Sequence, residues 1–204
     1  MIQIEHASTY AWEAAIRGMR NPLDSWEKSD TVYDVDGHPI IGAADMELMQ
    51  KLVRAGSDHA KFMRQILVSM DIVAPLYWWK ECDTYKVGTV TNSCSTMHTV
   101  TKKRFSATDF STDRLNFRGI EVLDFVIGRL NQFRDLYIET GDVEWWEQII
   151  QTLPSSYNQR RTLTANYEVL RNMYHARKNH KLKEWRDFCN WIRGLPYAEL
   201  ITVE

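Results

Sequence analysis

Polar side chains that could bind a ligand are concentrated between Ala74 and His98. Trp78 and Trp79 stand near the start of this stretch, and nearly every side chain from Thr89 to Thr96 carries a hydroxyl, amide or thiol group. A surface loop rarely contains so much Trp, and a core rarely contains so many polar groups without hydrogen-bond partners. The stretch therefore predicts one wall of a binding site, for a ligand with several hydrogen-bonding edges and negative charge.

A second set of polar residues lies on a predicted helix near the C-terminus. At ~100° per residue, Asn166, Leu170, Met173 and Arg177 fall along one helix face. Leu170 and Met173 are expected to pack in the core, whereas the carboxamide of Asn166 and the guanidinium of Arg177 need polar partners. A carboxamide can bind a uracil edge or a ribose, and a guanidinium can pair with phosphate or stabilise an anion on the base. The alternatives are an ion pair for Arg177 and a capping or buried-network role for Asn166 and Asn172.

Basic side chains near these two stretches could hold a phosphate. Arg160 and Arg161 come before the predicted helix, at whose start a phosphate could also meet free backbone N–H groups. A solvated pair of charges is the alternative for these two residues. Lys86 could contact a flavin or nucleotide phosphate as a point charge, without the bidentate fork of an Arg. The run from Lys102 to Arg104 lies in a polar segment that predicts a solvated loop.

Other chemistries have weaker support in the sequence. Cys94 could be a nucleophile only with a nearby base, and His98 would be too far away if the segment between them is extended. The sequence contains no HExxH, no paired-Cys spacing and no EF-hand loop, so we expect no metal site. It also contains no P-loop and no GxGxxG.

Helices and strands must position these residues. We expect strands at Met1–His6 and Ile66–Ile72, a hairpin at Thr31–Ile41 about Asp36-Gly37, and helices at Tyr10–Met19, Ala44–Ala55, Ile120–Phe133 and Val143–Thr152. The predicted strands alternate apolar and polar residues, whereas the predicted helices carry apolar residues at helical spacing. Asn21-Pro22 and Gly56 mark helix ends, and Gly141 separates the last two helices of this set.

Composition sets the protein class. With 204 residues, of which 44% are hydrophobic and 25% charged, the chain predicts one globular domain. A net charge of -2 gives no general argument for nucleic acid or acidic membranes. Three Cys residues without metal-ligand spacing favour a reducing, cytoplasmic location. We expect no membrane partner, because no apolar run approaches the roughly 20 residues that span a bilayer, and the N-terminus lacks a signal pattern.

Eight residues near the C-terminus share a spacing: Leu153, Pro154, Arg160, Thr164, Asn166, Leu170, Asn172 and Arg177. This spacing resembles the flavin-dependent thymidylate synthases (ThyX). That family has Leu-Pro, an Arg six residues after the Pro, a Thr-x-Asn helix, a second Asn and a final Arg that grips the pyrimidine. Glu168 stands where the family has a further Arg.

The stretch after Ala74 resembles the family signature RHRxxSxNxxSxR in a degenerate form. Lys86, Thr89 and Thr91 fall on the second Arg, the first Ser and the Asn. The replacements are Thr84 for the first Arg, Tyr85 for the His, Cys94 for the second Ser and Thr96 for the last Arg. A Gly-His-Glu segment of the family corresponds to Gly56, Ser57, Asp58 and His59.

The resemblance implies a fold and an activity. It implies an α+β fold with a central antiparallel sheet and long helices, as one domain over residues 1–204. It also implies an enzyme that methylates dUMP at carbon 5 with FAD, with NADPH and methylenetetrahydrofolate as cosubstrates. Members of the family are homotetramers whose subunits share sites, which fits exposed Trp-rich helices.

The resemblance also assigns roles to residues. Arg177 would be catalytic, by polarising the pyrimidine. The substrate would be bound by Glu81, Thr84, Asn92, Ser93, Cys94, Ser95, Thr96 and Arg160. The flavin would be bound by Ser57, Lys86, Asn166 and Asn172. Because the signature is degenerate, two alternatives stay open: a diverged, flavin-free protein that binds or modifies a pyrimidine nucleotide, and a structural or partner-binding module that has only inherited the fold.

Overall fold

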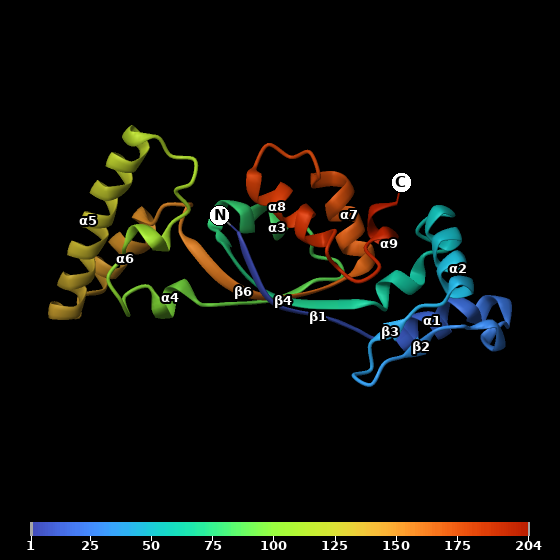
Figure 1. Ribbon diagram of the computed structural model, residues 1–204. Helices are drawn as coiled ribbons and strands as arrows, with labels where there is room; N and C mark the ends of the chain where they lie inside the picture. Colours follow the sequence, from blue (N-terminus) through green and yellow to red (C-terminus); the bar gives the residue numbers. More distant parts are fainter. Residues whose placement is uncertain (1, 204) are drawn as a thin grey trace. The chain divides into compact units, whose positions relative to one another are not determined.

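A four-stranded sheet is the central element of the structure, a computed structural model that describes residues 2–203 (Figure 1). Its strands lie in the order β1 (Gln3–Tyr10), β4 (Leu67–Pro75), β6 (Asn158–Asn166) and β5 (Val90–Ser93). The predicted α+β class, with a central antiparallel sheet and long helices, is confirmed. None of the described helices is long and apolar enough to cross a membrane.

The chain forms two compact units. The first unit contains the N-terminal residues up to Ile4, Ile72–Thr84 and Asn92–Thr162. The second contains Glu5–Asp71, Tyr85–Thr91 and the chain from Leu163 onward. Each of the four strands of the central sheet begins in one unit and ends in the other. A single domain over residues 1–204 stays a prediction.

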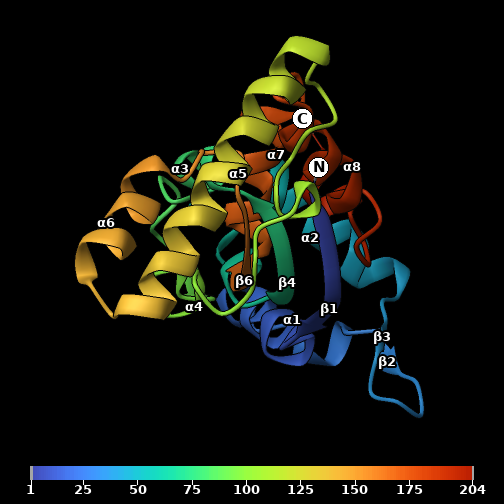
Figure 2. The ribbon, with the colours of Figure 1, turned by 90° about the vertical axis from the view of Figure 1, so that its left-hand side faces the viewer.

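The first unit carries α3 (Leu76–Cys82), α4 (Thr96–Thr99), α5 (Phe117–Thr140) and α6 (Val143–Thr152). Trp78 and Trp79 are fully buried, so the expectation of exposed Trp-rich helices is wrong for this pair. α5 and α6 form a helical hairpin in which they lie side by side (Figure 2). Gly141, at φ 70°, ends α5, and the Asp142 carboxylate caps α6. The predicted break between the two helices is confirmed.

The second unit carries α1 (Trp12–Arg20), α2 (Ala43–Arg54), α7 (Tyr167–Arg177), α8 (Lys183–Ile192) and α9 (Glu199–Thr202). It also contains 3-10 turns at Asn21–Leu23, Trp26–Lys28 and Lys61–Arg64. Its small hairpin pairs β2 (Val32–Tyr33) with β3 (Pro39–Ile40) in an antiparallel register. Gly37 lies at φ 80°, which confirms the turn predicted at Asp36-Gly37.

A buried ion pair joins α1 to α2. Arg20 Nε donates to Asp45 Oδ1 at 2.6 Å, and the two side chains are 4% and 0% exposed. Asp45 also accepts hydrogen bonds from the hydroxyls of Ser29 and Thr31. Burial raises the pKa of Asp45, but the hydrogen bonds from Thr31, Ser29 and Arg20 outweigh burial and hold the pKa below its usual value. The ionised pair therefore fixes the packing of these two helices.

β4 and α5 are longer than predicted, and two further elements differ from the sequence prediction. The first strand continues to Tyr10 rather than ending at His6, and its predicted first residue, Met1, lies outside the described residues. Arg160 and Arg161 lie within β6, so they do not stand free before a helix. On one face of this strand Gln159, Leu163 and Ala165 are buried, while Arg161 on the same face is partly buried.

Candidate functional site

A cavity of about 240 Å³ in the first unit brings together several residues of the predicted substrate site. It lies between β6 and the segment that leads from β5 into α4. Its lining residues are Val73, Cys94, Thr96, Thr99, Lys103, Asp109, Tyr157, Asn158, Gln159 and Arg160. Hydroxyl, thiol, amide, carboxylate and cationic groups therefore surround one small volume.

Gln159 fixes the geometry of this cavity. Its side chain is buried, and its Nε2 donates to the Cys94 carbonyl at 2.9 Å and to Thr96 Oγ1 at 3.2 Å. Its Oε1 accepts from Arg161 Nε at 3.0 Å. All the polar groups of the amide are thus used, and the segment from Cys94 to Thr96 is held against β6. The Cys94 N–H strengthens this contact by donating to the Arg160 carbonyl at 2.9 Å.

Arg161 holds the side chain of Gln159 in place. Its guanidinium lies over the Trp79 ring at 4.4 Å and donates to Asp83 at 2.7 Å. Trp79 Nε1 in turn donates to the Gln159 carbonyl at 3.0 Å. A buried aromatic ring, a cation and a carboxylate therefore fix the side chain that shapes the cavity.

The cationic side of the cavity contains an ion pair. Lys103 bonds to Asp109, whose carboxylate also accepts from the Ser106 N–H at 2.9 Å. Burial raises the pKa of Asp109, but the hydrogen bond from Lys103 and the one from Ser106 bring the net pKa below its usual value. Burial, with the charge of Asp109, raises the pKa of Tyr157, so this phenol stays a neutral hydrogen-bonding group. The segment expected to be a solvated loop therefore contributes directly to the cavity.

The predicted substrate residues divide into two sets. Cys94, Thr96 and Arg160 line the cavity together. Ser95 caps the start of α4, where its carbonyl accepts from the Thr99 N–H and hydroxyl. Ser95 lies outside the lining, as do Glu81 on α3, Thr84 after it, and Asn92 and Ser93 on β5. The Thr84 hydroxyl bonds to the Glu81 carbonyl at 2.7 Å, which ends α3.

Arg177 lies in a second cluster, within the second unit. Its Nε donates to the Tyr85 hydroxyl at 3.0 Å. The guanidinium also lies 4.9 Å from the centroid of the Trp185 ring and 5.7 Å from that of Tyr85. The two rings meet edge to face, with centroids 6.0 Å apart. Aromatic faces and one hydroxyl thus orient this Arg.

Asn166 has the capping role that the sequence left open. Its Oδ1 accepts from the Val169 N–H at 2.9 Å at the start of α7, and the side chain is buried. A Cβ at Gly88 (φ +79°) would lie 2.8 Å from Asn166 Nδ2, so the turn after Tyr85 approaches this helix end closely. The other three predicted flavin residues, Ser57, Lys86 and Asn172, are exposed.

Glu168 is paired within the second unit. Arg64 Nη2 donates to Glu168 Oε1 at 3.0 Å, and Arg64 Nε makes a second, shorter contact with the other carboxylate oxygen. The position at which the family has an Arg is therefore occupied by an acid that already has its own cation.

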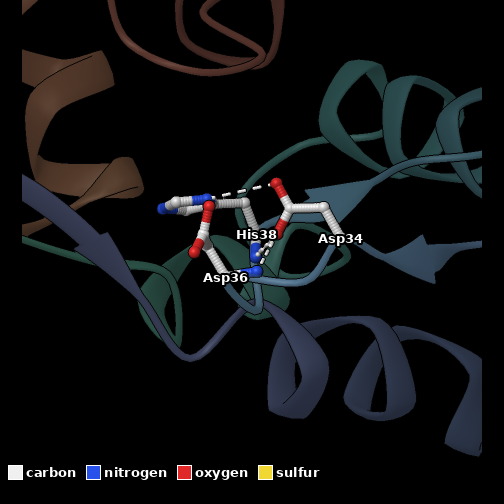
Figure 3. Close-up of side chains that lie close together, drawn as sticks. All are labelled: Asp34, Asp36 and His38. Atoms are coloured by element: carbon white, nitrogen blue, oxygen red, sulfur yellow. Dashed lines mark hydrogen bonds and ion pairs between the residues drawn. The ribbon is translucent and has the colours of Figure 1, made fainter.

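A cluster of titratable groups that the sequence analysis did not single out lies at the β2–β3 turn (Figure 3). One ligand atom each from Asp34, Asp36 and His38 lies within 4.8 Å of the others. Asp34 Oδ1 accepts from the Asp36 N–H at 3.0 Å and from the His38 N–H at 2.8 Å. The backbone hydrogen bond from His38 is the main cause of the lowered pKa of Asp34. These hydrogen bonds account for the cluster as a turn-stabilising arrangement.

No model of a known protein family matches the sequence, and no curated protein matches it at a significant level. Solved structures do match over the whole chain. Two crystal structures of the flavin-dependent thymidylate synthase ThyX from Helicobacter pylori, each with FAD and dUMP, superpose with a TM-score of 0.69 at 19% sequence identity. The match covers 100% of this chain and 97% and 96% of those chains. This chain therefore has the fold of the flavin-dependent thymidylate synthases.

Proposed function

We propose that this chain is a thymidylate synthase-like enzyme that methylates dUMP at carbon 5, with FAD as cofactor and methylenetetrahydrofolate as carbon donor. The observation that carries the proposal is the meeting of Cys94, Thr96 and Arg160 in one cavity. Their assignment to the substrate came from the sequence resemblance alone. Solved structures that share the fold hold dUMP and FAD, which supports the same ligands here.

The chemistry of the cavity suits the anionic end of a nucleotide. Arg160 supplies positive charge, as does Lys103 beside the Asp109 carboxylate, and the Thr96 hydroxyl can donate to a phosphate or ribose oxygen. A volume of about 240 Å³ is small for a whole nucleotide. We expect it to hold the phosphate end, with the base extending beyond it.

In this proposal Arg177 activates the pyrimidine. A guanidinium group can stabilise negative charge that develops on the base. The Tyr85 hydroxyl accepts from Nε, and the rings of Tyr85 and Trp185 lie beside the guanidinium, so its plane is fixed. Tyr85 and Trp185 would thus act as positioning residues for Arg177.

The flavin residues fit FAD in part. Ser57, Lys86 and Asn172 are exposed and could donate to the cofactor, whereas Asn166 already uses its carbonyl oxygen as a helix cap. Reduced FAD would supply hydride, with NADPH as its reductant. The role of this chain would be to bind the cofactor through Lys86 and to hold the pyrimidine beside it.

A flavin-free pyrimidine-nucleotide protein of the same fold is the second candidate. Two observations favour it: the capping role of Asn166 and the pairing of Glu168 with Arg64. Both remove groups that could contact a flavin. The retained Arg160 and Arg177 would still bind and polarise a nucleotide.

An absorption spectrum separates the two candidates. The purified chain is incubated with FAD and dUMP, excess ligand is removed, and the visible spectrum is recorded. We expect a flavin band at near-stoichiometric amounts. No band, together with a rise in the melting temperature on adding dUMP alone, would support the flavin-free candidate. Failure of both dUMP and FAD to bind would contradict both candidates and favour a structural module.

We also propose that the chain assembles into a homotetramer. The outer face of α5 exposes apolar side chains, with Phe117 75%, Val122 64% and Phe125 64% exposed. Large apolar side chains exposed together on one helix favour burial in an interface. Sedimentation velocity should give a mass near four times 24.0 kDa. A monomer at micromolar concentration would contradict the assembly.

A further inference from the structure

A cavity of about 840 Å³ in the second unit lies outside the proposed nucleotide site. It runs along the end of β1 and the start of α1, and the β2–β3 turn and the α8–α9 connection close its other sides. Its lining residues are Ala7–Glu13, Tyr33, Asp36–Pro39, Trp191 and Gly194–Pro196. We call it the β1 groove.

The β1 groove borders a free sheet edge. Among the described strands, β1 is the outermost of the central sheet and its neighbour is β4. The backbone groups on the outer side of such a strand have no partner strand. His6 and Ala11 have positive φ (52° and 63°), so the regular strand that borders the groove is limited to Ala7–Tyr10.

The four residues Ala7–Tyr10 carry none of the side chains that commonly protect an edge strand. Natural edge strands avoid pairing with other chains by carrying Lys, Pro or inward-pointing charges. The sequence here is Ala-Ser-Thr-Tyr, with no charged residue and no Pro. A short, unprotected edge that lies in a groove is the arrangement that accepts an added strand in many peptide-binding domains.

The walls of the groove are held in place. Trp12 is buried, and its Nε1 donates to Thr9 Oγ1 at 3.0 Å. Its ring packs edge to face against Tyr197, with centroids 5.4 Å apart. The Tyr197 hydroxyl donates to the Pro39 carbonyl at 2.8 Å and accepts from the Ile41 N–H at 2.9 Å. Tyr197 therefore holds the β2–β3 hairpin in place beside the groove. Because this wall is already fixed, ligand binding needs little further ordering of the protein.

The charge of the groove selects the ligand. The described residues that line the groove include two carboxylates, those of Glu13 and Asp36. They include no Lys and no Arg. Figure 3 shows the Asp36 carboxylate at the hairpin turn. Glu13 makes a long contact of 3.7 Å with Arg17, and its side chain is exposed and accessible. Half-exposed Tyr10 and Tyr33 add ring faces that suit aliphatic or cationic side chains.

We propose that the β1 groove binds an extended, positively charged peptide segment of a partner protein, which adds to the sheet as a further strand beside Ala7–Tyr10. The backbone of the peptide pairs with the free edge of β1. Its basic side chains meet Glu13 and Asp36, and its other side chains pack on Tyr10 and Tyr33. This interaction surface is independent of the nucleotide proposal.

The test uses the full chain and a capped hexapeptide of alternating Lys and Val that carries a fluorophore. Fluorescence anisotropy measures binding, and hydrogen exchange measures protection of the backbone amides. We expect the peptide to bind, to slow exchange at Ala7–Tyr10, and to bind more weakly as salt is raised. A matched peptide of alternating Glu and Val should not bind. An N-methylated form of the Lys-Val peptide, which cannot donate backbone hydrogen bonds, should lose binding.

The variant Glu13→Gln with Asp36→Asn should weaken binding of the Lys-Val peptide about fivefold, because two exposed charge contacts are lost. The control variant Glu139→Gln with Asp124→Asn changes the net charge equally on exposed positions of α5 and should leave binding unchanged. Equal binding of the N-methylated peptide, protection at another segment, or no binding would overturn the proposal. Protection of Ala7–Tyr10 that rises with protein concentration without peptide would also overturn it, in favour of a second copy of the chain.

Discussion

Gln159 connects more residues of the candidate site than its single amide group would suggest. Its one amide group connects the Cys94 carbonyl, the Thr96 hydroxyl and the Arg161 guanidinium. Among the described contacts of the cavity, the hydrogen bonds from Gln159 are the shortest that any side chain makes to Cys94 or Thr96. A residue that no motif singled out therefore determines where two predicted substrate residues lie.

Replacing Gln159 tests this arrangement. We expect Gln159→Ala to lower the free energy of unfolding by about 1–3 kcal/mol, because buried partners lose their hydrogen bonds. It should also weaken dUMP binding about tenfold, since the segment from Cys94 to Thr96 is released. Calorimetry and a dUMP titration measure the two effects. Gln151→Ala, at an exposed position of α6, is the control and should change neither quantity. Unchanged dUMP affinity in Gln159→Ala would remove this cavity from the nucleotide site.

The Arg20–Asp45 pair gives a prediction about acid stability. The folded pKa of Asp45 is lowered, so its ionised form contributes stability above its unfolded pKa of about 4. That contribution is lost as the pH falls through the lower folded value. Asp45→Asn should cost about 3–5 kcal/mol at neutral pH, because Arg20 is left buried without its partner.

The stability of Asp45→Asn should also depend less on pH than that of the parent chain between about pH 5 and pH 2. Urea unfolding at several pH values measures this. The control Asp124→Asn, at an exposed position of α5, should behave like the parent at every pH. A parallel loss of stability in Asp45→Asn and the parent would show that Asp45 does not titrate in this range.

Individual residues were predictable where one interaction decided their place. Leu170 and Met173 are fully buried, as their helical spacing predicted. Asn166 had two readings, and the structure selects the helix cap, because the residue ends β6 and starts α7. The partners of Arg177 were not predictable, since Trp185 comes from another helix and its meeting with Arg177 depends on tertiary packing.

At the scale of elements, the α5–α6 hairpin depends on its glycine. Gly141→Ala should lower the free energy of unfolding by about 1 kcal/mol, because a Cβ disfavours the left-handed conformation at φ 70°. Gly128→Ala is the matched control within α5, where a Cβ would meet nothing within 4 Å. It should stabilise the protein by up to about 1 kcal/mol. Thermal unfolding measures both, and a stabilising Gly141→Ala would show that the helix end can rearrange.

Elements with strong local signals matched the sequence prediction, whereas β6 did not. Asp36-Gly37 and Gly141 have backbone conformations that favour Gly, so their turns are visible in the sequence. β6 contains Arg160 and Arg161 side by side, which hides the alternation of its buried residues. Its central place in the sheet comes from pairing with β4 and β5, which are distant in sequence.

At the scale of the whole molecule, the question is whether the two compact units unfold together. Each strand of the central sheet begins in one unit and ends in the other, so neither unit contains a complete strand of that sheet. Loss of the strands in one unit should therefore destabilise the other. We expect one thermal transition by calorimetry, with equal calorimetric and van't Hoff enthalpies.

Two variants make this test specific to the units. Gly141 belongs to the first unit and Asp45 to the second. In a single cooperative domain, Gly141→Ala and Asp45→Asn both move the same transition to lower temperature, each by an amount set by its own loss of stability. In two independent domains, each variant would move one of two transitions and leave the other in place. Because assembly also raises the melting temperature, all samples are compared at one protein concentration. A single transition that both variants shift would establish residues 1–204 as one folding domain, as the resemblance to the flavin-dependent thymidylate synthases implies.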